Sequence, residues 1–297
     1  MLSPAGLSAA TTPRAGAFAP QQLCRRLRAS LSAMSAAPRQ ITSTKNPLVQ
    51  RFRAAAAGEL DGVLLAEGVR LVGEAVAAKA RVLQAAMSPR CADANLRHAL
   101  QAAAQECYEC SDDVLAALSA LDTPQGVAAL IERPRADEAA LLRQGRVPLV
   151  VCAAGVRDPG NLGSVLRTAE AAGATGVITL QGGADPFRDK AVRGSMGSIF
   201  RLPTLHGLDA AAVVAFARRH RLQLVVADGG GERAHTAVDL KRPLLLVVGA
   251  EAAGVPKELL AAADARVRIP LQAPVESLNV AVAAGVLLYE AQRQRGA

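Results

Sequence analysis

The chain has 297 residues, 51% of them hydrophobic, and a formal net charge of +8 at pH 7. This length is enough for two ordinary domains, each with its own buried core. With no Trp, two Tyr and five Phe, the chain lacks the exposed rings that a base-stacking nucleic-acid binder needs. No run of about eighteen uncharged apolar residues is present, which argues against a membrane span.

The basic charge is concentrated at the start of the chain. Residues 1–40 contain five arginines and no acidic residue, so the remainder, with 29 basic and 26 acidic residues, has a net charge of +3. Residues 1–38 lack hydrophobic periodicity and are rich in Ala, Ser, Pro and Arg, and we expect them to be disordered. Two interpretations remain open: an organelle transit peptide, or a start site assigned too early, with Met34 the true beginning. The second, which we favour slightly, places the protein in the cytoplasm; the first places it in a mitochondrion or plastid.

The segment 41–132 is predicted to form a small α/β domain. Short apolar runs at 63–66, 82–87 and 126–131 alternate with helical segments near 68–79, 92–105 and 111–120. Residues 133–147, which follow, are charged and contain a proline, so they are the expected linker.

The segment 148–297 is predicted to be a second α/β domain. The pattern indicates strands at 148–155, 176–180, 222–227, 244–249 and 265–269, helices at 162–172, 209–219, 256–263 and 277–294, and a loop at 181–198. Uninterrupted apolar strands such as 243–249 are typical of a mostly parallel sheet that is buried on both faces. A Rossmann enzyme with a nucleotide cofactor would need a G-x-G-x-x-G turn after its first strand, and the sequence has none.

The five cysteines indicate a reducing compartment rather than a disulfide framework. Their number is odd and they show no paired spacing, at positions 24, 91, 107, 110 and 152. Cys107 and Cys110 form a lone C-x-x-C. A metal site would need a second pair, so we interpret them as ordinary partly buried thiols, and we expect no metal.

Three blocks punctuated by glycine, proline and asparagine stand where strand-like runs end. They read D-P-G-N-L-G-S-V-L-R-T-A (158–169), L-L-L-V-V-G-A-E-A-A-G-V-P (244–256) and I-P-L-Q-A-P-V-E-S-L-N-V-A-V-A (269–283). Ligand sites of α/β proteins lie at such strand ends. In the first block we expect Asn161 to cap the following helix, in the third we expect Ser277 to do so, and Asn279 would then lie in a first helical turn.

These blocks resemble the three signature motifs of the SpoU/TrmH-type RNA ribose 2′-O-methyltransferases, in the SPOUT class. The matching residues are Asn161, Gly163, Arg167, Gly249, Glu251, Gly254, Ile269, Pro270, Ser277, Leu278 and Asn279. Segment 41–131, with A-E-G at 66–68 and T-P-Q-G at 123–126, also resembles the small RNA-substrate-binding domain that precedes the catalytic domain in many members. The resemblance covers all but the first forty residues.

The resemblance implies a trefoil-knotted α/β methyltransferase domain and transfer of a methyl group from S-adenosyl-L-methionine to a ribose 2′-hydroxyl of RNA. It assigns catalysis to Arg167, Asn161, Glu251, Ser277 and Asn279, and cofactor binding to Gly249, Ile269, Leu271 and Leu278. A guanidinium stays protonated up to a pH above about 12. We therefore expect Arg167 to polarise the hydroxyl and stabilise the developing alkoxide rather than to act as a base.

The same resemblance implies a homodimer formed through the C-terminal domain, and an RNA-contacting loop with Arg188, Lys190 and Arg193. Ribosomal RNA is the expected substrate, by analogy with the N-terminal domain. The alternatives are a transfer RNA 2′-O-methyltransferase and a non-catalytic RNA-binding protein on the same fold. The latter would be expected to lose Asn161, Arg167 or the 277–279 group, and all are present.

Overall fold

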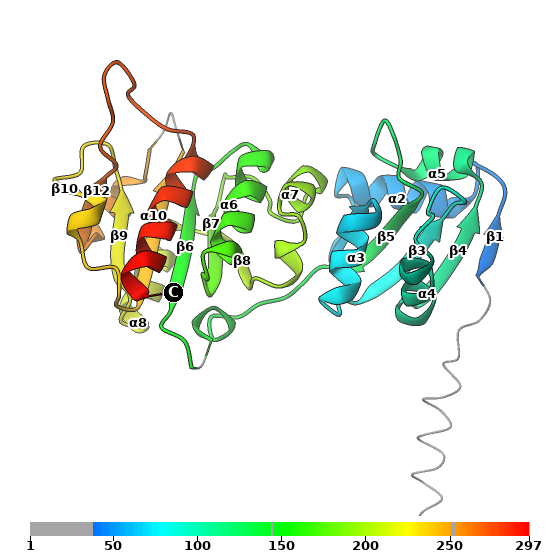
Figure 1. The fold of residues 1–297 in the computed structure, drawn as a ribbon, viewed down its shortest axis with the longest axis horizontal. Helices are drawn as coiled ribbons and strands as arrows, with labels where there is room; N and C mark the ends of the chain where they lie inside the picture. Colours follow the sequence, from blue (N-terminus) through cyan, green and yellow to red (C-terminus); the bar gives the residue numbers. More distant parts are fainter. Residues whose placement is uncertain (1–37, 144, 251–253, 297) are drawn as a thin grey trace, which may run out of the picture. The chain divides into compact units, whose positions relative to one another are not determined.

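The computed structural model describes residues 38–143, 145–250 and 254–296, and these form two separate β-sheets, each with helices on both faces (Figure 1). Residues 1–38, predicted to be disordered, lie outside the described part except for Pro38. Among the described residues, no helix is both long and apolar enough to cross a membrane.

The N-terminal sheet has five strands in the order β1-β4-β3-β5-β2. The strands β1, β4 and β3 run parallel, whereas β5 is antiparallel to β3 and to β2. Helices α2 and α5 contribute to the core on one face, and α3 and α4 to the core on the other. The elements are β1 (Arg39–Ile41), α2 (Pro47–Ala57), β2 (Val63–Glu67), α3 (Val69–Ala77), β3 (Val82–Met87), α4 (Ala94–Ala103), β4 (Glu106–Cys110), α5 (Asp112–Leu118) and β5 (Val127–Glu132).

The predicted strands near 63–66, 82–87 and 126–131 are β2, β3 and β5, and the three predicted helices are α3, α4 and α5. Three elements were missing from the prediction: β1, α2 and β4. Strand β4 reads E-C-Y-E-C, in which no continuous apolar run marks a strand. Helix α2 is signalled by Asn46, whose side chain accepts a hydrogen bond from the backbone of Leu48, and by Pro47 at its first position.

The C-terminal sheet has seven strands in the order β10-β12-β9-β11-β6-β7-β8, and every neighbouring pair is parallel. The predicted parallel sheet is therefore confirmed. The elements are β6 (Leu149–Ala154), α6 (Pro159–Ala171), β7 (Gly176–Leu180), α7 (Asp189–Gly194), β8 (Thr204–Leu208), α8 (Ala210–Arg219), β9 (Gln223–Ala227), β10 (Arg233–Ala234), β11 (Leu244–Gly249), α9 (Lys257–Ala262), β12 (Ala265–Arg268) and α10 (Val280–Arg295).

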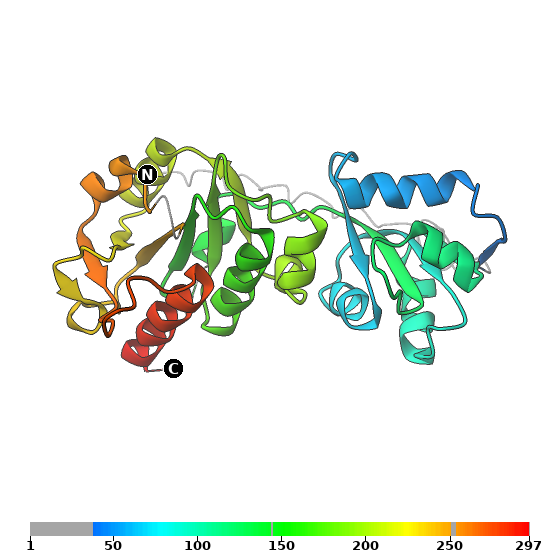
Figure 2. The ribbon, with the colours of Figure 1, turned by 90° about the horizontal axis from the view of Figure 1, so that it is seen from above.

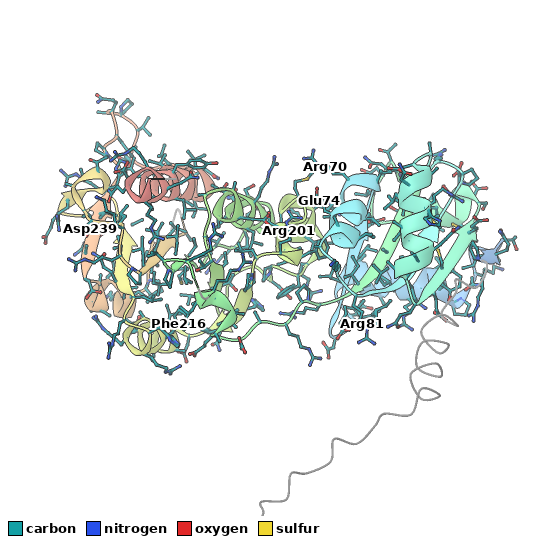
Figure 3. All side chains as sticks on the ribbon, turned by 60° about the horizontal axis from the view of Figure 1, so that its bottom comes forward. Arg70, Glu74, Arg81, Arg201, Phe216 and Asp239 are labelled. Carbon is teal, nitrogen blue, oxygen red and sulfur yellow. The ribbon has the colours of Figure 1, made fainter. Side chains whose placement is uncertain are left out.

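Alternating side chains of the central strands pack into two cores. Val151 and Leu246 belong to the core under α6 and α10, whereas Val150 and Leu245 belong to the core under α8 and α9. Figure 2 shows these two helix pairs on opposite faces of the sheet. The second core includes the fully buried ring of Phe216 from α8, labelled in Figure 3. Because both faces are covered, the strands are apolar throughout, as the sequence indicated.

The order of the strands is not the order of the chain. Strand β11 lies between β6 and β9. After β12, which is near one edge of the sheet, the chain comes back toward the centre, where α10 packs against α6 and β11. This arrangement agrees with the knotted domain that the family resemblance implies.

Two predictions about this domain were wrong in detail. The predicted loop 181–198 contains helix α7, and strand β8 follows it; both are short and lack a long apolar run. The predicted helix caps were also misplaced. Asp158, not Asn161, caps α6, because its carboxylate accepts the backbone N–H of Asn161. Asn279, not Ser277, caps α10, accepting from the backbone N–H groups of Ala281 and Val282.

Helix α10 is fastened at its C-terminal end by Arg295. The guanidinium of Arg295 donates hydrogen bonds to four backbone carbonyl groups, those of Val147, Pro148, Leu240 and Arg242, at 2.7–3.2 Å. These carbonyls precede β6 and β11, so one side chain joins the helix to the amino-terminal edge of the sheet. One turn earlier, the buried carboxylate of Glu290 accepts from Arg293 and Gln294.

Glu290 should make the stability of the protein depend on pH. The hydrogen bonds from Arg293 and Gln294 lower the pKa of this carboxyl from 4.5 to about 2. A carboxyl whose pKa is lowered on folding stabilises the native state above its unfolded pKa and loses that contribution as the pH falls toward the folded value. We therefore expect Glu290→Gln to reduce the free energy of unfolding at pH 7 and to flatten its decline between pH 4.5 and pH 2.

Urea denaturation across this pH range measures the effect, with Glu258→Gln as the control because Glu258 is exposed on α9. A decline of equal steepness in wild type and Glu290→Gln would contradict the assignment.

Candidate active site

A cavity of about 430 Å³ opens at the carboxyl-terminal edge of the C-terminal sheet. Parallel strands bring their carboxyl ends to one edge, and here the ends of β9, β11 and β12 form three sides of the cavity. The segment 276–283, which includes the start of α10, forms the fourth. The lining residues are Ala227, Asp228, Gly229, Val248, Gly249, Ala250, Gly254, Val255, Val267, Ile269, Leu271, Glu276, Ser277, Leu278, Val280 and Ala283.

All four residues predicted to bind the cofactor line this one cavity: Gly249, Ile269, Leu271 and Leu278. Of the residues predicted to be catalytic, Ser277 also lines it. These residues come from the second and third sequence blocks, so the fold brings together segments that are about twenty residues apart in the sequence.

Gly249 lets the chain approach itself closely at the end of β11. A Cβ atom at this position would lie 2.6 Å from the carbonyl carbon of Gly254 and 2.7 Å from the side chain of Val255. Gly254 has a φ of +65°, in the left-handed region that favours glycine. The loop can therefore fold back over the strand end, as the bridge between Ala250 and Gly254 shows, only because residue 249 has no side chain.

The first and third sequence blocks meet through a pair of asparagines. The side-chain amide of Asn279 donates to the side-chain oxygen of Asn161 at 3.0 Å. Asn161 lies in the first turn of α6 and Asn279 caps α10. This contact joins the ends of the two helices next to the cavity.

Helix α7 is held against the start of α6 by small residues and one ion pair. A Cβ atom at Gly163 would lie 2.6 Å from the carbonyl oxygen of Ala191 and 2.8 Å from Gly194, so the two helices touch backbone to backbone. Nearby, the ammonium of Lys190 lies 2.8 Å from the carboxylate of Asp158, and this hydrogen bond lowers the pKa of Asp158.

The three residues predicted to contact RNA all lie beside carboxylates. Lys190 pairs with Asp158, Arg193 with Asp189, and Arg188 lies 3.8 Å from Asp185. These pairs are on or next to α7, so the three cations do share one short segment. Their role in RNA binding stays a prediction.

Arg167 is exposed on α6 and is not among the residues that line the cavity. Within the described residues it makes no ion pair. Its neighbour Thr168 faces α10, where a Cβ atom on Gly285 would lie 3.5 Å from the Thr168 side chain. Glu251, the remaining predicted catalytic residue, lies outside the described residues.

The segment after β9 also lines the cavity, which was not predicted from the sequence. Asp228 and Gly229 line the cavity directly after this strand, and the carboxylate of Asp228 binds the guanidinium of Arg266, which lowers its pKa. The available signal was the D-G-G-G stretch at 228–231, which follows a predicted strand just as the other blocks do. Glu276, next to the predicted Ser277, was also missed.

Comparison with known proteins supports the interpretation of both halves. Residues 148–289 match the model of the SpoU rRNA Methylase family, and residues 52–129 match the MRM3-like substrate binding domain. An uncharacterized tRNA/rRNA methyltransferase of Synechocystis is 32% identical, over 86% of this chain and 94% of that protein. The 23S rRNA (guanosine(2553)-2′-O)-methyltransferase RlmP of Bacillus subtilis is 35% identical, over 62% of this chain and 71% of that protein.

Among solved structures, the AdoMet-bound rRNA methyltransferase from Sinorhizobium meliloti superposes with a TM-score of 0.77. It is 31% identical, and the match covers 86% of this chain and 97% of that one. A relative above 30% identity that is spanned almost completely, together with the two family models, decides the assignment. The chain belongs to the SpoU rRNA methylase family, in the SPOUT class.

Proposed function

We propose that this protein transfers a methyl group from S-adenosyl-L-methionine to the 2′-hydroxyl of a ribose in ribosomal RNA. The observation that carries the proposal is the cavity at the carboxyl edge, where the residues predicted for the cofactor converge. The Asn161–Asn279 contact, which ties the first sequence block to the third, lies at the starts of α6 and α10 beside it. Relatives named as 23S rRNA 2′-O-methyltransferases favour ribosomal over transfer RNA.

The cavity fits the cofactor in size and chemistry. Its volume of about 430 Å³ lies within the range of small-molecule sites, about 300–1,000 Å³. Apolar side chains such as Leu271 and Leu278 suit an adenine ring, while the carboxylate of Glu276 suits the ammonium group of the cofactor's methionine part. Bound there, S-adenosyl-L-methionine supplies an activated methyl group on its sulfonium.

The difficulty that the protein must solve is the weak nucleophile, because a ribose hydroxyl is hardly ionised at neutral pH. Arg167, exposed on α6, donates hydrogen bonds to the oxygen on which negative charge develops, and one such donor is worth about 10²–10³ in rate. Asn161, held by Asn279 at 3.0 Å, fixes the start of the helix that carries Arg167. Alignment of oxygen and methyl group supplies the remaining acceleration.

A second copy of the chain is the proposed partner of the face formed by α10 and the loop before it. Four of the five large exposed hydrophobic residues of the described part belong to this region: Leu271, Val275, Val282 and Tyr289. Val282 and Tyr289 are seven residues apart, hence on one side of the helix, and each is half exposed. An apolar patch beside an active site is typical of an interface, and this one supports the homodimer expected from the sequence.

The N-terminal domain is the proposed RNA-substrate-binding domain. It spans the segment that matches the substrate-binding family model, and its helices leave arginines such as Arg51 and Arg70 exposed, as is Arg90.

The cysteines of the described part are free, and burial raises the pKa of Cys110 to about 11 and of Cys152 to about 12. Unpaired, unreactive thiols support the proposed cytoplasmic location.

Replacing Arg167 tests the reaction. We expect Arg167→Ala to reduce methyl transfer to in vitro transcribed 23S rRNA about 100-fold or more, with unchanged affinity for S-adenosyl-L-methionine. Arg167→Lys keeps the charge but loses the planar fork of donors, so it should restore only a small part of the activity. The measurement uses tritiated cofactor, with the modified nucleotide mapped by primer extension. Full activity of Arg167→Ala would remove this residue from the mechanism.

Filling the space at Gly249 tests the cofactor site. The new Cβ of Gly249→Ala would lie under 3 Å from the backbone of Gly254, and such overpacking costs about 1–3 kcal/mol. We expect cofactor affinity, measured by calorimetry, to fall about 5–150-fold. The control is Gly73→Ala, since a Cβ at Gly73 in α3 meets no atom within 4 Å and should leave cofactor binding unchanged. Equal affinities for the two variants would show that the cofactor binds elsewhere.

Charges on the apolar face of α10 test the homodimer. Val282→Asp with Tyr289→Asp should convert a dimer into a monomer in light scattering, because a buried unpaired carboxylate opposes association. Val147→Asp is the control: Val147 is equally exposed but lies before β6, outside the patch. A wild-type monomer, or a dimer that survives the double substitution, would contradict the proposal.

A further inference from the structure

A second hollow, of about 500 Å³, lies at the amino-terminal edge of the C-terminal sheet. Strands β9 and β11 are parallel neighbours, with Gln223 in register with Leu244, so the turns that precede them lie side by side. The hollow is formed between these turns and the end of α8. Its lining residues are Ala217, Arg218, Arg221, Leu222, Gln223, Arg242, Pro243 and Asp264.

This edge is opposite the cofactor cavity. In Figure 1 it is the lower edge of the sheet, where α8 and the C-terminus lie, whereas the loop between β12 and α10 is at the top. Strands of five or six residues that rise about 3.3 Å per residue separate the two edges by about 15–20 Å.

The charge of the hollow is positive, with three arginines and one carboxylate among its lining residues. Asp264 is already engaged, because one oxygen binds Arg218 at 2.9 Å and the other accepts the backbone N–H of Leu224 at 2.8 Å. The positive charges of the other two arginines, Arg221 and Arg242, are balanced weakly or not at all by nearby carboxylates. Arg242 has Asp239 at 3.3 Å, but this pair is largely exposed and therefore weak; Asp239 is labelled in Figure 3.

Arg221 makes no ion pair within the described residues, and its backbone has a φ of +53°. This left-handed conformation is uncommon for a residue with a long side chain. It occurs where α8 turns into β9, with the backbone N–H of Arg221 bonded to the carbonyl of Arg218. The strained turn places an uncompensated guanidinium at the hollow.

Gln223 contributes an unused acceptor. Its side-chain oxygen is sequestered from solvent and accepts no hydrogen bond from the described residues. Because this oxygen is closed to solvent, a ligand in the hollow reaches it only after the Gln223 side chain rotates, whereas the side chains of Arg221 and Arg242 are exposed to anionic oxygens. Guanidinium groups bind phosphate through paired hydrogen bonds.

We propose that this arginine-lined hollow binds the ribose-phosphate backbone of the RNA substrate, at a distance from the nucleotide that is methylated. The proposal rests on the proposed function in that the ligand is the same RNA. It assigns to the C-terminal domain an RNA contact that neither the cofactor cavity nor the α7 segment supplies. An acidic protein surface is the competing occupant; RNA is favoured because the planar guanidinium groups of Arg221 and Arg242 match the paired oxygens of a phosphate and the proposed substrate already carries such phosphates.

The test removes the two weakly compensated charges from the full chain. In the double variant Arg221→Asn with Arg242→Gln, asparagine is chosen because it tolerates positive φ. Binding of in vitro transcribed 23S rRNA is measured at several KCl concentrations. We expect the dissociation constant to rise about tenfold or more. The slope of log K against log salt should decrease by about 1–2, as expected for two lost phosphate contacts. KM for the RNA should rise, with unchanged affinity for S-adenosyl-L-methionine.

The matched control is Arg219→Gln. Arg219 is next to Arg218 on α8 but is bound by Glu138 and does not line the hollow, so its loss should change affinity and slope far less. If the double variant does not fold, as judged by circular dichroism, Arg242→Gln alone should show a decrease in slope of about 0.7–0.9.

Unchanged RNA affinity and slope in a folded variant would overturn the proposal. Unchanged RNA affinity together with altered self-association in light scattering would do so too, and would assign the hollow to a protein contact. Failure of the wild-type chain to methylate any 23S rRNA, despite salt-dependent binding that weakens in the double variant, would instead count against the proposed function and leave the hollow as an RNA site.

Discussion

The parallel pairing of β6, β11 and β9 is the constraint on which the rest of the C-terminal domain depends. Strand β11 is in register with β6 over six residues and with β9 over four. Because the three strands pair in parallel, they all run in the same direction. Their carboxyl ends therefore lie at one edge of the sheet and their amino ends at the other. Both faces must then be covered by helices, because the apolar side chains of these strands alternate between one core and the other.

The site is assembled from strand ends rather than from any single motif. Gly249 allows the loop after β11 to fold over the strand, and Ile269 follows β12. The contact between Asn161 and Asn279 joins α6 to α10. None of these residues is reactive by itself. Their value is positional, which explains why a cofactor site can be built from glycines, aliphatic side chains and amides with few charged groups.

Much of the fold and of the candidate site could be predicted from the sequence, because continuous apolar strands such as β11 and blocks at strand ends are strong local signals. The capping residues of α6 and α10 were predicted wrongly, since Asp158 and Asn279 compete with equally good candidates nearby and tertiary contacts decide between them. Strands such as β4 and β8 were not predicted, because about half of their side chains are polar or small and they form no apolar run. Register, the position of β11 and the Arg295 contacts are set by distant segments, for which local pattern holds no information.

The fastening of α10 at both ends has a consequence for how the domain opens. Asn279 holds the start of the helix to α6, and Arg295 holds its end to four carbonyls at the opposite edge. A fluctuation that lifts the helix must therefore break both attachments, so the two edges of the sheet belong to one cooperative unit in hydrogen exchange. Occupation of the cofactor cavity should then slow exchange of the amides around Leu240 as well, although these lie at the far edge of the sheet from the cavity.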